Sequence, residues 1–213
     1  MRNKVIHALR RLAFEPAIVL DVGANIGQSV AEFREAYPMA RIHAFEPIRA
    51  SFVQLQAATE ADPLTTAYNV ALSRAEATLT MTSRGASTGN KIVAQAMGPL
   101  LEEVAAETGD GFCARHGITR IDFLKIDTEG HDLDVLMGMH RMLTAGAVRF
   151  VQAECGLAPS NVRHVGYERL AAIMGAFGYG LFGLFGLTPL RGTANLSAHY
   201  SDAVFVRDDW QAV

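Results

Sequence analysis

The stretch Asp21-Val22-Gly23-Ala24-Asn25-Ile26-Gly27 joins the apolar, β-rich residues 17–22 to a segment of helical composition, residues 28–37. Gly23 permits a tight turn there, and Gly27 allows a strand or a ligand to approach the helix closely. Asn25 adopts unusual backbone angles readily and can hydrogen-bond a ligand. A strand, a glycine turn and a helix in this order predict the first β-α unit of an α/β sheet, with a ligand at the turn.

The β-α pattern repeats along the chain, which predicts one α/β domain over residues 1–213. Alternating strands and helices favour a mostly parallel sheet with helices on both faces. One further helix is marked by apolar residues on a single face: Leu133, Leu136, Met137, His140 and Leu143. The other helices are predicted over residues 47–60 and 166–177, and the other strands over residues 41–45, 65–70, 77–82, 121–127, 148–154, 179–185 and 203–206.

Four segments do not follow the simple repeat. Residues 84–90 form a predicted polar loop, and residues 181–187 a buried strand and turn, too short and too rich in glycine to span a bilayer. Residues 91–116 have a helical composition interrupted at Pro99 and at residues 109–111, which predicts two short helices. Residues 1–15 predict one amphipathic helix, because their apolar residues recur at helical spacing: Val5, Ile6, Leu9, Leu12 and Ala13.

Composition narrows the class of protein. Hydrophobic residues make up 50% of the chain and charged residues 19%, as in a soluble globular domain. The net charge is -3 and the basic residues are scattered, which argues against a nucleic-acid partner. Cys113 and Cys155 have neither zinc-site nor disulfide-framework spacing, and Arg10 and Arg11 interrupt the apolar N-terminus. We therefore expect a cytoplasmic protein with no signal peptide and no membrane span.

The acid after the second predicted strand indicates the kind of ligand. Glu46 stands 19 residues after Gly27, where a carboxylate can accept hydrogen bonds from both hydroxyls of a ribose; a helix-start acid facing solvent is the alternative. The turn lacks the second glycine that lets a pyrophosphate approach, which disfavours NAD. S-adenosylmethionine (SAM) has no phosphate, and Asp21 and the loop amides suit its zwitterionic amino acid end. The pattern favours SAM.

A second group of ionisable residues is predicted at the opposite side of the pocket. Asp127 ends a buried strand and could orient the cofactor's amino group or the acceptor. Glu129, His131 or Glu154 could accept a proton from a hydroxyl, although each also suits a structural role as a helix-flanking residue or an ion-pair partner. The carboxylates of Asp127, Glu129 and Glu154 could also hold a divalent metal ion, but their spacing matches no known metal signature, so we expect none.

The chain resembles the FkbM-type methyltransferases in four motifs over about residues 17–154: Val19-Leu20-Asp21-Val22-Gly23-Ala24-Asn25-Ile26-Gly27, Ala44-Phe45-Glu46-Pro47, Asn69-Val70-Ala71-Leu72 and Leu124-Lys125-Ile126-Asp127-Thr128-Glu129-Gly130-His131. The resemblance implies a Rossmann-like class I methyltransferase fold, with a mostly parallel seven-stranded sheet flanked by helices. It also implies a cofactor pocket lined by Asp21, Gly23, Ala24, Asn25, Gly27, Glu46, Pro47, Asn69, Ala71 and Asp127. Two departures from the family concern the acceptor side: Ser87-Thr88-Gly89-Asn90 only approximates a serine-rich element, and residues 91–116 are longer than expected.

The function that the resemblance implies is SAM-dependent methylation, with S-adenosylhomocysteine as product. The expected acceptor is a hydroxyl of a sugar, a glycan or a natural product, methylated by in-line displacement. The alternatives are a nicotinamide-dependent oxidoreductase and a SAM-binding partner protein without catalysis. We expect a small-molecule or glycan acceptor as the partner, and a homodimer is compatible with the sequence.

Overall fold

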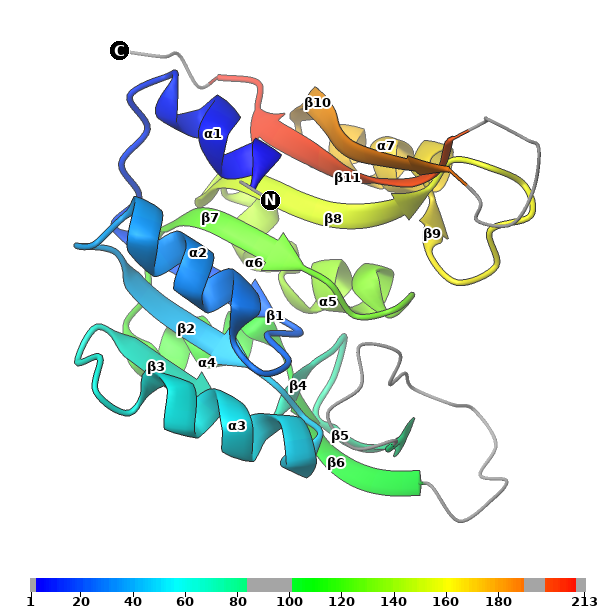
Figure 1. The fold of residues 1–213 in the computed structure, drawn as a ribbon. Coiled ribbons are helices and arrows are strands. Elements are labelled where there is room, and N and C mark those ends of the chain that lie inside the picture. Colours follow the sequence, from blue (N-terminus) through cyan, green and yellow to red (C-terminus); the bar gives the residue numbers. More distant parts are fainter. Residues whose placement is uncertain (1–2, 84–100, 190–197, 210–213) are drawn as a thin grey trace.

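A largely parallel sheet runs through the centre of the molecule (Figure 1). The computed structural model describes residues 3–83, 101–189 and 198–209. The main path of the sheet has the order β10-β11-β8-β7-β1-β2-β3, and the short β9 pairs with β8 beside this path. Its strands are β1 (Ile18–Val22), β2 (Arg41–Phe45), β3 (Thr65–Tyr68), β7 (Ile121–Ile126), β8 (Val148–Gly156), β9 (Val165–Gly166), β10 (Tyr179–Pro189) and β11 (Ala198–Arg207).

The directions of the strands match the predicted fold class. Strands β3, β2, β1, β7 and β8 are parallel, whereas β11 runs antiparallel to both β8 and β10. The seven strands of the main path confirm the predicted α/β sheet. Because β1 lies between β2 and β7, the chain leaves β1 at the point where the strand order reverses, which is where such sheets hold ligands.

Helices cover both faces of this sheet (Figure 1). Helices α1, α2 and α3 pack on one face through Val5, Phe33 and Leu55, and α4 to α7 pack on the other through residues such as Phe112 and Leu170. The helices are α1 (Lys4–Arg10), α2 (Gln28–Ala36), α3 (Arg49–Thr59), α4 (Gly109–His116), α5 (Asp132–Gly138), α6 (His140–Thr144) and α7 (Tyr167–Ala176). In the described part of the chain, no helix is long and apolar enough to cross a membrane.

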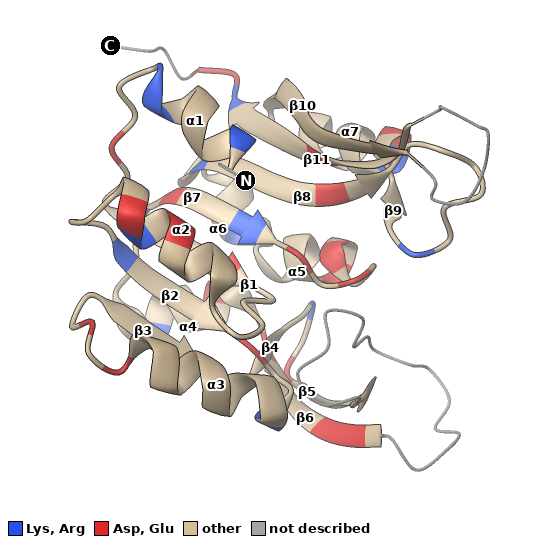
Figure 2. Cartoon of the chain, viewed as in Figure 1, with Lys and Arg blue, Asp and Glu red and all other residues tan. Residues whose placement is uncertain are grey.

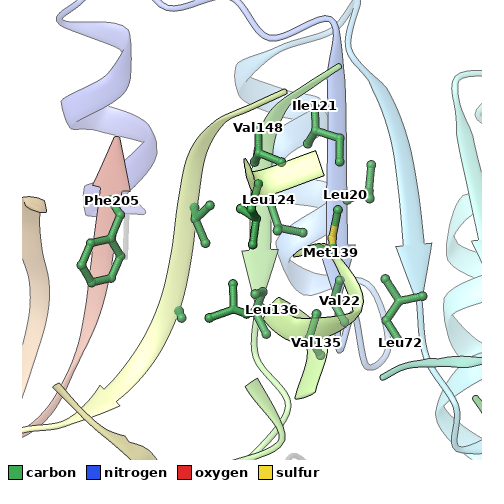
Figure 3. Packing of buried hydrophobic residues seen from close by; sticks show 14 of the residues in the cluster. Leu20, Val22, Leu72, Ile121, Leu124, Val135, Leu136, Met139, Val148 and Phe205 are labelled. Atoms are coloured by element: carbon green, nitrogen blue, oxygen red, sulfur yellow. The ribbon is translucent and has the colours of Figure 1, made fainter. Parts of the chain in front are cut away.

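The core follows from the alternation of side chains along the strands. In β1, Val19 packs with the α1–α3 layer, whereas Leu20 packs with the α4–α7 layer. Figure 3 shows the second of these layers, in which Leu20 and Leu124 meet Leu136 and Met139. Both faces of the central strands are therefore buried, which explains why β1 and β7 appear in the sequence as nearly continuous apolar runs.

A second, smaller sheet corrects one prediction. Residues 101–107, expected to be helical, form β6 (Leu101–Glu107), which pairs with β4 (Ala71–Leu72) and with β5 (Ala77–Thr82). Along β6, Val104 and Ala106 are buried whereas Glu103 and Ala105 are exposed, a period of two that the helix-favouring composition concealed. Helix α4 begins at residues 109–111, where an interruption was expected, and continues to His116. The predicted strand at 77–82 is β5. Residues 84–90 and 91–100 lie outside the described residues.

Three further expectations need correction. Helix α1 ends at Arg10, so Leu12 and Ala13 lie outside it, and Ala13 has a left-handed φ of 52°. The single helix expected over residues 133–143 is divided at Met139 into α5 and α6, and Met137 is 44% exposed. Strand β10 is an edge strand rather than a buried one, because Leu181 and Leu187 are 44% and 59% exposed, and a bulge at Gly186 replaces the predicted turn.

Candidate active site

A pocket of about 570 Å³ opens at the carboxyl ends of β1, β2, β7 and β8. It brings together most of the residues predicted for the cofactor and the chemistry, from motifs far apart in the chain. Those that line it are Gly23, Ala24, Asn25, Glu46, Pro47, Ala71, Asp127, Glu129, His131 and Glu154. Three predicted cofactor residues do not line the pocket and lie behind its wall: Asp21, Gly27 and Asn69.

The turn after β1 is held in its shape by close backbone contacts. The N–H groups of Gly23 and Ala24 both donate to the carbonyl of Phe45, at 3.0 and 2.9 Å. Gly23 has a φ of +82°, and a Cβ there would lie 2.0 Å from the carbonyl oxygen of Asp127. Gly27 has a φ of +97° and approaches Leu55 of α3 rather than the pocket. The glycines therefore serve the packing of the turn, and Gly23 fixes its distance from the end of β7.

Glu46 is a buried carboxylate at the rim of this turn. It is 7% exposed, and its two oxygens accept hydrogen bonds from the N–H groups of Asn25, at 3.0 Å, and Ile48, at 2.8 Å. Burial raises the pKa of Glu46 to about 7, against the opposing effect of these two N–H donors. Because each carboxylate oxygen has a second lone pair, the side chain retains acceptor capacity toward the pocket.

Asn69 supports Glu46 from behind. Its Nδ2 donates to the carbonyls of Glu46 and Pro47, at 3.0 and 2.8 Å. The side-chain amide thus ties the end of β3 to the turn after β2. The first residue of the Asn69-Val70-Ala71-Leu72 motif therefore supports the wall of the pocket and does not line it.

Lys125 connects the two halves of the pocket, and it was given no role by the sequence. Its Nζ lies 3.2 Å from Oδ1 of Asp21 and 3.3 Å from Oδ2 of Asp127. Asp21 is fully buried and also accepts a hydrogen bond from Ser29. Burial alone would lower the pKa of Lys125, but the two carboxylates outweigh it and raise that pKa. Lys125 is therefore a buried ammonium that neutralises Asp21; the sequence signal for it is a lysine inside an apolar strand.

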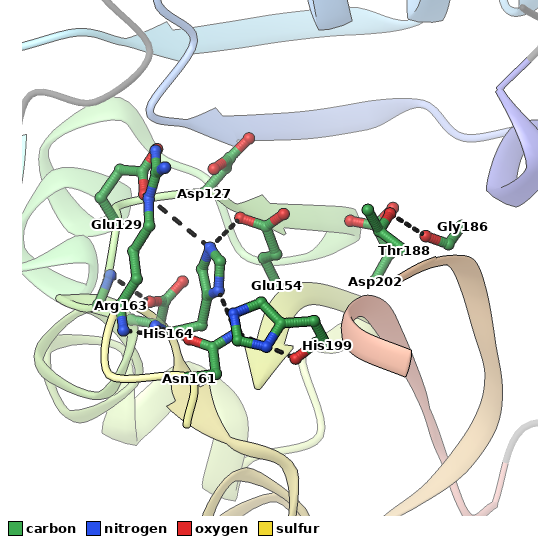
Figure 4. A network of polar contacts seen from close by, with 12 residues as sticks. Asp127, Glu129, Glu154, Asn161, Arg163, His164, Gly186, Thr188, His199 and Asp202 are labelled. Carbon is green, nitrogen blue, oxygen red and sulfur yellow. Dashed lines mark hydrogen bonds and ion pairs between the residues drawn. The ribbon is translucent and has the colours of Figure 1, made fainter. Parts of the chain in front are cut away.

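Glu129 and His131 are each held by other side chains. Glu129 has a left-handed φ of 57° and forms a two-point ion pair with the guanidinium of Arg163 (Figure 4). The two ring nitrogens of His131 contact Oγ of Ser73, at 3.0 Å, and Oδ2 of Asp134, at 3.1 Å. Burial lowers the pKa of His131 despite the charge of Asp134.

Glu154 contacts His164, a residue that the sequence analysis did not identify. Its Oε2 lies 2.9 Å from Nε2 of His164, which is only 7% exposed (Figure 4). Its other oxygen has no hydrogen-bond partner among the residues described here. Burial lowers the pKa of His164, but the hydrogen bond to Glu154 and the charges of Glu154 and Glu129 outweigh it, so the net shift is upward. His164 follows the end of β8 in an irregular loop, where periodicity gives no signal.

Asn161 fixes the orientation of His164. Its Oδ1 accepts the backbone N–H groups of Arg163 and His164, both at 3.0 Å. Its Nδ2 is thereby left to donate to the carbonyl of His199, at 3.1 Å, and to Nδ1 of His164, at 2.9 Å. A reversed amide would set NH₂ against two N–H donors, so this orientation is the one that satisfies all four contacts.

Glu129, Glu154 and His164 are close enough together to be considered as ligands of a metal ion, within 4.8 Å of one another. Their contacts do not fit that role. A histidine that binds a metal through Nε2 donates its Nδ1–H to an acceptor, but here Nδ1 faces the NH₂ of Asn161. Both oxygens of Glu129 are also engaged by Arg163. The contacts of these three residues therefore do not fit a metal site.

The floor of the pocket between β8 and β11 is polar as well. Gln152 donates from Nε2 to Oδ1 of Asp202 at 3.0 Å, and Asp202 is the cross-strand partner of Glu154. Burial raises the pKa of Asp202. Figure 2 shows acidic segments at the carboxyl ends of the strands and no continuous basic segment on the described elements. This end of the pocket thus presents several side-chain oxygen atoms.

Comparison with known proteins agrees with this geometry. The profile of the Methyltransferase FkbM domain matches residues 21–180. The hexuronic acid methyltransferase AglP of Haloferax volcanii is 26% identical over 161 residues, which cover 74% of this chain and 64% of AglP. Methyltransferase 1 of Beauveria bassiana is 27% identical over 147 residues, 59% of each chain. The matched part thus spans less than two thirds of both relatives.

Solved structures establish the fold. Magnesium protoporphyrin IX methyltransferase (ChlM) from Synechocystis PCC 6803, with bound SAM, has a TM-score of 0.55 and 14% identity, covering 96% of this chain and 76% of the other. Fibrillarin from Aeropyrum pernix, with natively bound SAM, has a TM-score of 0.54 and 13% identity, covering 96% and 75%. The expected class I methyltransferase fold is confirmed.

Proposed function

Because the chain belongs to the FkbM methyltransferase domain family, we propose that it transfers the methyl group of SAM to a hydroxyl of a sugar, a glycan or a natural product. One observation carries this proposal: a single pocket has the tight turn at Gly23 and the buried carboxylate of Glu46 on one side, and Glu154 on the other. The turn and the acid suit a ribose without phosphates. The opposite half suits removal of a proton from a hydroxyl.

The cofactor half supplies binding and orientation. Glu46 would accept hydrogen bonds from the ribose hydroxyls, and the strand-end Asp127 would attract the ammonium group of the cofactor's amino acid end. Asn25 contributes an Oδ1 that has no hydrogen-bond partner among the described residues. When bound, SAM supplies an activated methyl group on a sulfonium ion. The residues that line the pocket would orient this cofactor and exclude water from it.

Glu154 is the best candidate for the proton acceptor. Among the predicted catalytic residues, Glu129 is engaged by Arg163, Asp127 pairs with Lys125, and His131 uses both ring nitrogens. Glu154 lies in the pocket wall, and one of its carboxylate oxygens lacks a described partner. Its other oxygen faces the ring of His164, whereas Asp127 is held by the ammonium group of Lys125. Glu154 would take the proton that the acceptor hydroxyl loses when its oxygen is methylated.

A polyhydroxyl acceptor fits the chemistry of this half. Glu154, Asp202 and Gln152 present acceptors where sugar hydroxyls would donate. AglP, which is named for a hexuronic acid, supports a carbohydrate acceptor in this family. The turn does not support the nicotinamide alternative. The second glycine of a dinucleotide-binding motif, which lets a pyrophosphate approach the backbone, is replaced here by Asn25.

Binding and turnover test the proposal separately. Titration calorimetry with SAM and S-adenosylhomocysteine is expected to give saturable binding, with no binding of NADH. A panel of glycosides and polyols, assayed by S-adenosylhomocysteine release, then identifies the acceptor. Absence of SAM binding would refute the proposal, and NADH binding would favour an oxidoreductase. SAM binding together with an unreactive panel of hydroxyl acceptors would support the non-catalytic partner instead.

A further inference from the structure

His164 presents a single tautomer to Glu154 because of Asn161. The carboxamide of Asn161 donates to Nδ1 of His164 at 2.9 Å, and its orientation is fixed by two backbone N–H groups and one carbonyl. A nitrogen that accepts a hydrogen bond carries no proton in the neutral ring. The proton of His164 therefore resides on Nε2, which faces Oε2 of Glu154 at 2.9 Å.

The surroundings hold this chain of contacts in place. Asn161 packs against the backbone of Gly156 at the end of β8, where an added Cβ would lie 3.1 Å from its Cγ. The ring of His164 lies beside that of Tyr200, with centroids 5.1 Å apart, and is 7% exposed. If either side chain left its position, a polar group that is now hydrogen-bonded would lose its partner, which is unfavourable.

These contacts fix the orientation of the Glu154 carboxylate. With Oε2 held by the Nε2–H of His164, rotation of the Glu154 carboxylate is restricted and Oε1 is the oxygen that remains for the acceptor. When Oε1 takes the acceptor's proton, Oε2 keeps its hydrogen bond as a carbonyl oxygen, so the geometry persists through the transfer. The proton then leaves from Glu154 to solvent, because Nε2 is already protonated and Nδ1 is covered by Asn161.

We propose that Asn161 and His164 are positioning residues of the methyl transfer: Asn161 selects the Nε2–H tautomer of His164, and His164 aims Glu154 at the acceptor hydroxyl. This inference rests on the proposed function, in which Glu154 accepts the proton. Within the chain, it assigns a role to two loop residues that the sequence motifs do not contain.

Long-range ¹H–¹⁵N NMR of the histidine rings tests the tautomer without any acceptor. His164 is expected to show the Nε2–H form in the wild-type protein and in the Glu154→Gln variant. The Asn161→Asp variant, which is nearly isosteric, offers an oxygen to Nδ1 and is expected to move a proton to Nδ1. An Nδ1–H signal in the wild type, or no change in Asn161→Asp, would overturn the proposal.

Kinetics test the consequence for Glu154. His164→Ala and Asn161→Asp are expected to lower kcat about 10- to 100-fold, as misplacement of a reacting group does. His164→Gln, which can keep an N–H donor near the Nε2 position, is expected to recover part of this loss. The Kd of SAM should stay unchanged in all three variants, and His7→Gln on the exposed side of α1 serves as the matched control.

The two proposals fail in different ways. If SAM does not bind to the wild type, the proposed function fails, while the tautomer of His164 is still decided by NMR. If SAM binds and an acceptor is methylated, but His164→Ala keeps its kcat, only the positioning proposal is overturned. A loss of kcat that His164→Phe and His164→Gln share equally, with unchanged circular dichroism, would also contradict a role for the N–H donor.

Discussion

A Cβ atom on Gly23 would lie 2.0 Å from the carbonyl oxygen of Asp127, so the glycine turn and the end of β7 are in direct backbone contact. The N–H of Asp127 in turn donates to the carbonyl of Val22 at 2.9 Å. Two motifs that are 104 residues apart, counted from Gly23 to Asp127, thus form one rigid edge of the pocket. Substitutions on either side are expected to act on both.

The first prediction concerns this contact. Gly23→Ala introduces a Cβ into the backbone of Asp127 at a φ of +82°, so we expect a loss of at least about 2 kcal/mol of unfolding free energy. We also expect weaker SAM binding. Urea denaturation and calorimetry measure the two effects. Gly175→Ala in α7, where an added Cβ meets nothing within 4 Å, is the matched control and should leave both unchanged or slightly raise stability.

The second prediction links SAM affinity to pH through Glu46. Its pKa is raised to about 7 in the free protein, mainly by burial, and donors from a ribose would favour the ionised form. Affinity is therefore expected to fall roughly tenfold per pH unit below that pKa and to be level above it. Calorimetry between pH 5 and 9 would measure this. The Glu46→Gln variant should bind more weakly and without this dependence; a wild-type affinity that is flat across the range would contradict the role of Glu46.

The third prediction concerns stability and the same carboxylate. Because the pKa of Glu46 is higher in the folded protein, about 7 against 4.5, its contribution to stability is present at low pH and is lost as pH rises through this window. Relative to the wild type, Glu46→Gln should therefore gain stability between these pH values, by on the order of 3 kcal/mol. Urea denaturation of both proteins at several pH values provides the measurement. Parallel curves would show that burial does not disfavour the charged form.

The fourth prediction concerns the buried pair of Lys125 and Asp21. Lys125→Met would leave the fully buried carboxylate of Asp21 without its cation, at a cost of about 3–5 kcal/mol. The double variant Asp21→Asn, Lys125→Met should recover much of this loss, because no unpaired charge remains. A double-mutant cycle by urea denaturation measures the coupling. Additive effects of the two substitutions would show that the pair is not coupled.

The fifth prediction distinguishes the candidate bases. Glu154→Gln is expected to lower kcat about 10²- to 10⁴-fold with little change in the Kd of SAM, because it removes the proton acceptor and keeps the shape. Asp202→Asn, which alters the cross-strand neighbour on β11, is the control and should have a smaller effect. Rates of S-adenosylhomocysteine release measure both. Equal loss in the two variants would indicate a shared electrostatic effect in place of a base.

An element could be predicted from the sequence where local residue patterns determine it, and could not where contacts with distant segments determine it. The turn after β1 and the strands β1, β2 and β7 follow from local patterns, because a central parallel strand buries both faces and its turn needs glycine. Strand β6 could not be predicted, because its residues favour a helix and become a strand through pairing with β4 and β5. The tertiary partner overrides the local preference there.

The candidate site divides in the same way. Residues at strand ends, such as Glu46 and Asp127, were predictable because the carboxyl ends of parallel strands meet at one edge. The buried pairing of Asp21 with Lys125 needed the distances, since a sequence shows a charge but not its partner. Asn161, Arg163 and His164 lie in a loop without periodicity, so only the fold could bring them to Glu154.

The small sheet of β4, β5 and β6 has an evolutionary consequence. It lies beside the main sheet and packs in a cluster of its own with Ile48, while contributing Met81 to the pocket wall. Mutations in β5 and β6 can therefore accumulate without disturbing the strand order that holds the turn at Gly23. Divergence of acceptor preference among descendants of this chain is expected to concentrate in that hairpin, which makes it the natural segment to exchange when a new specificity is to be selected.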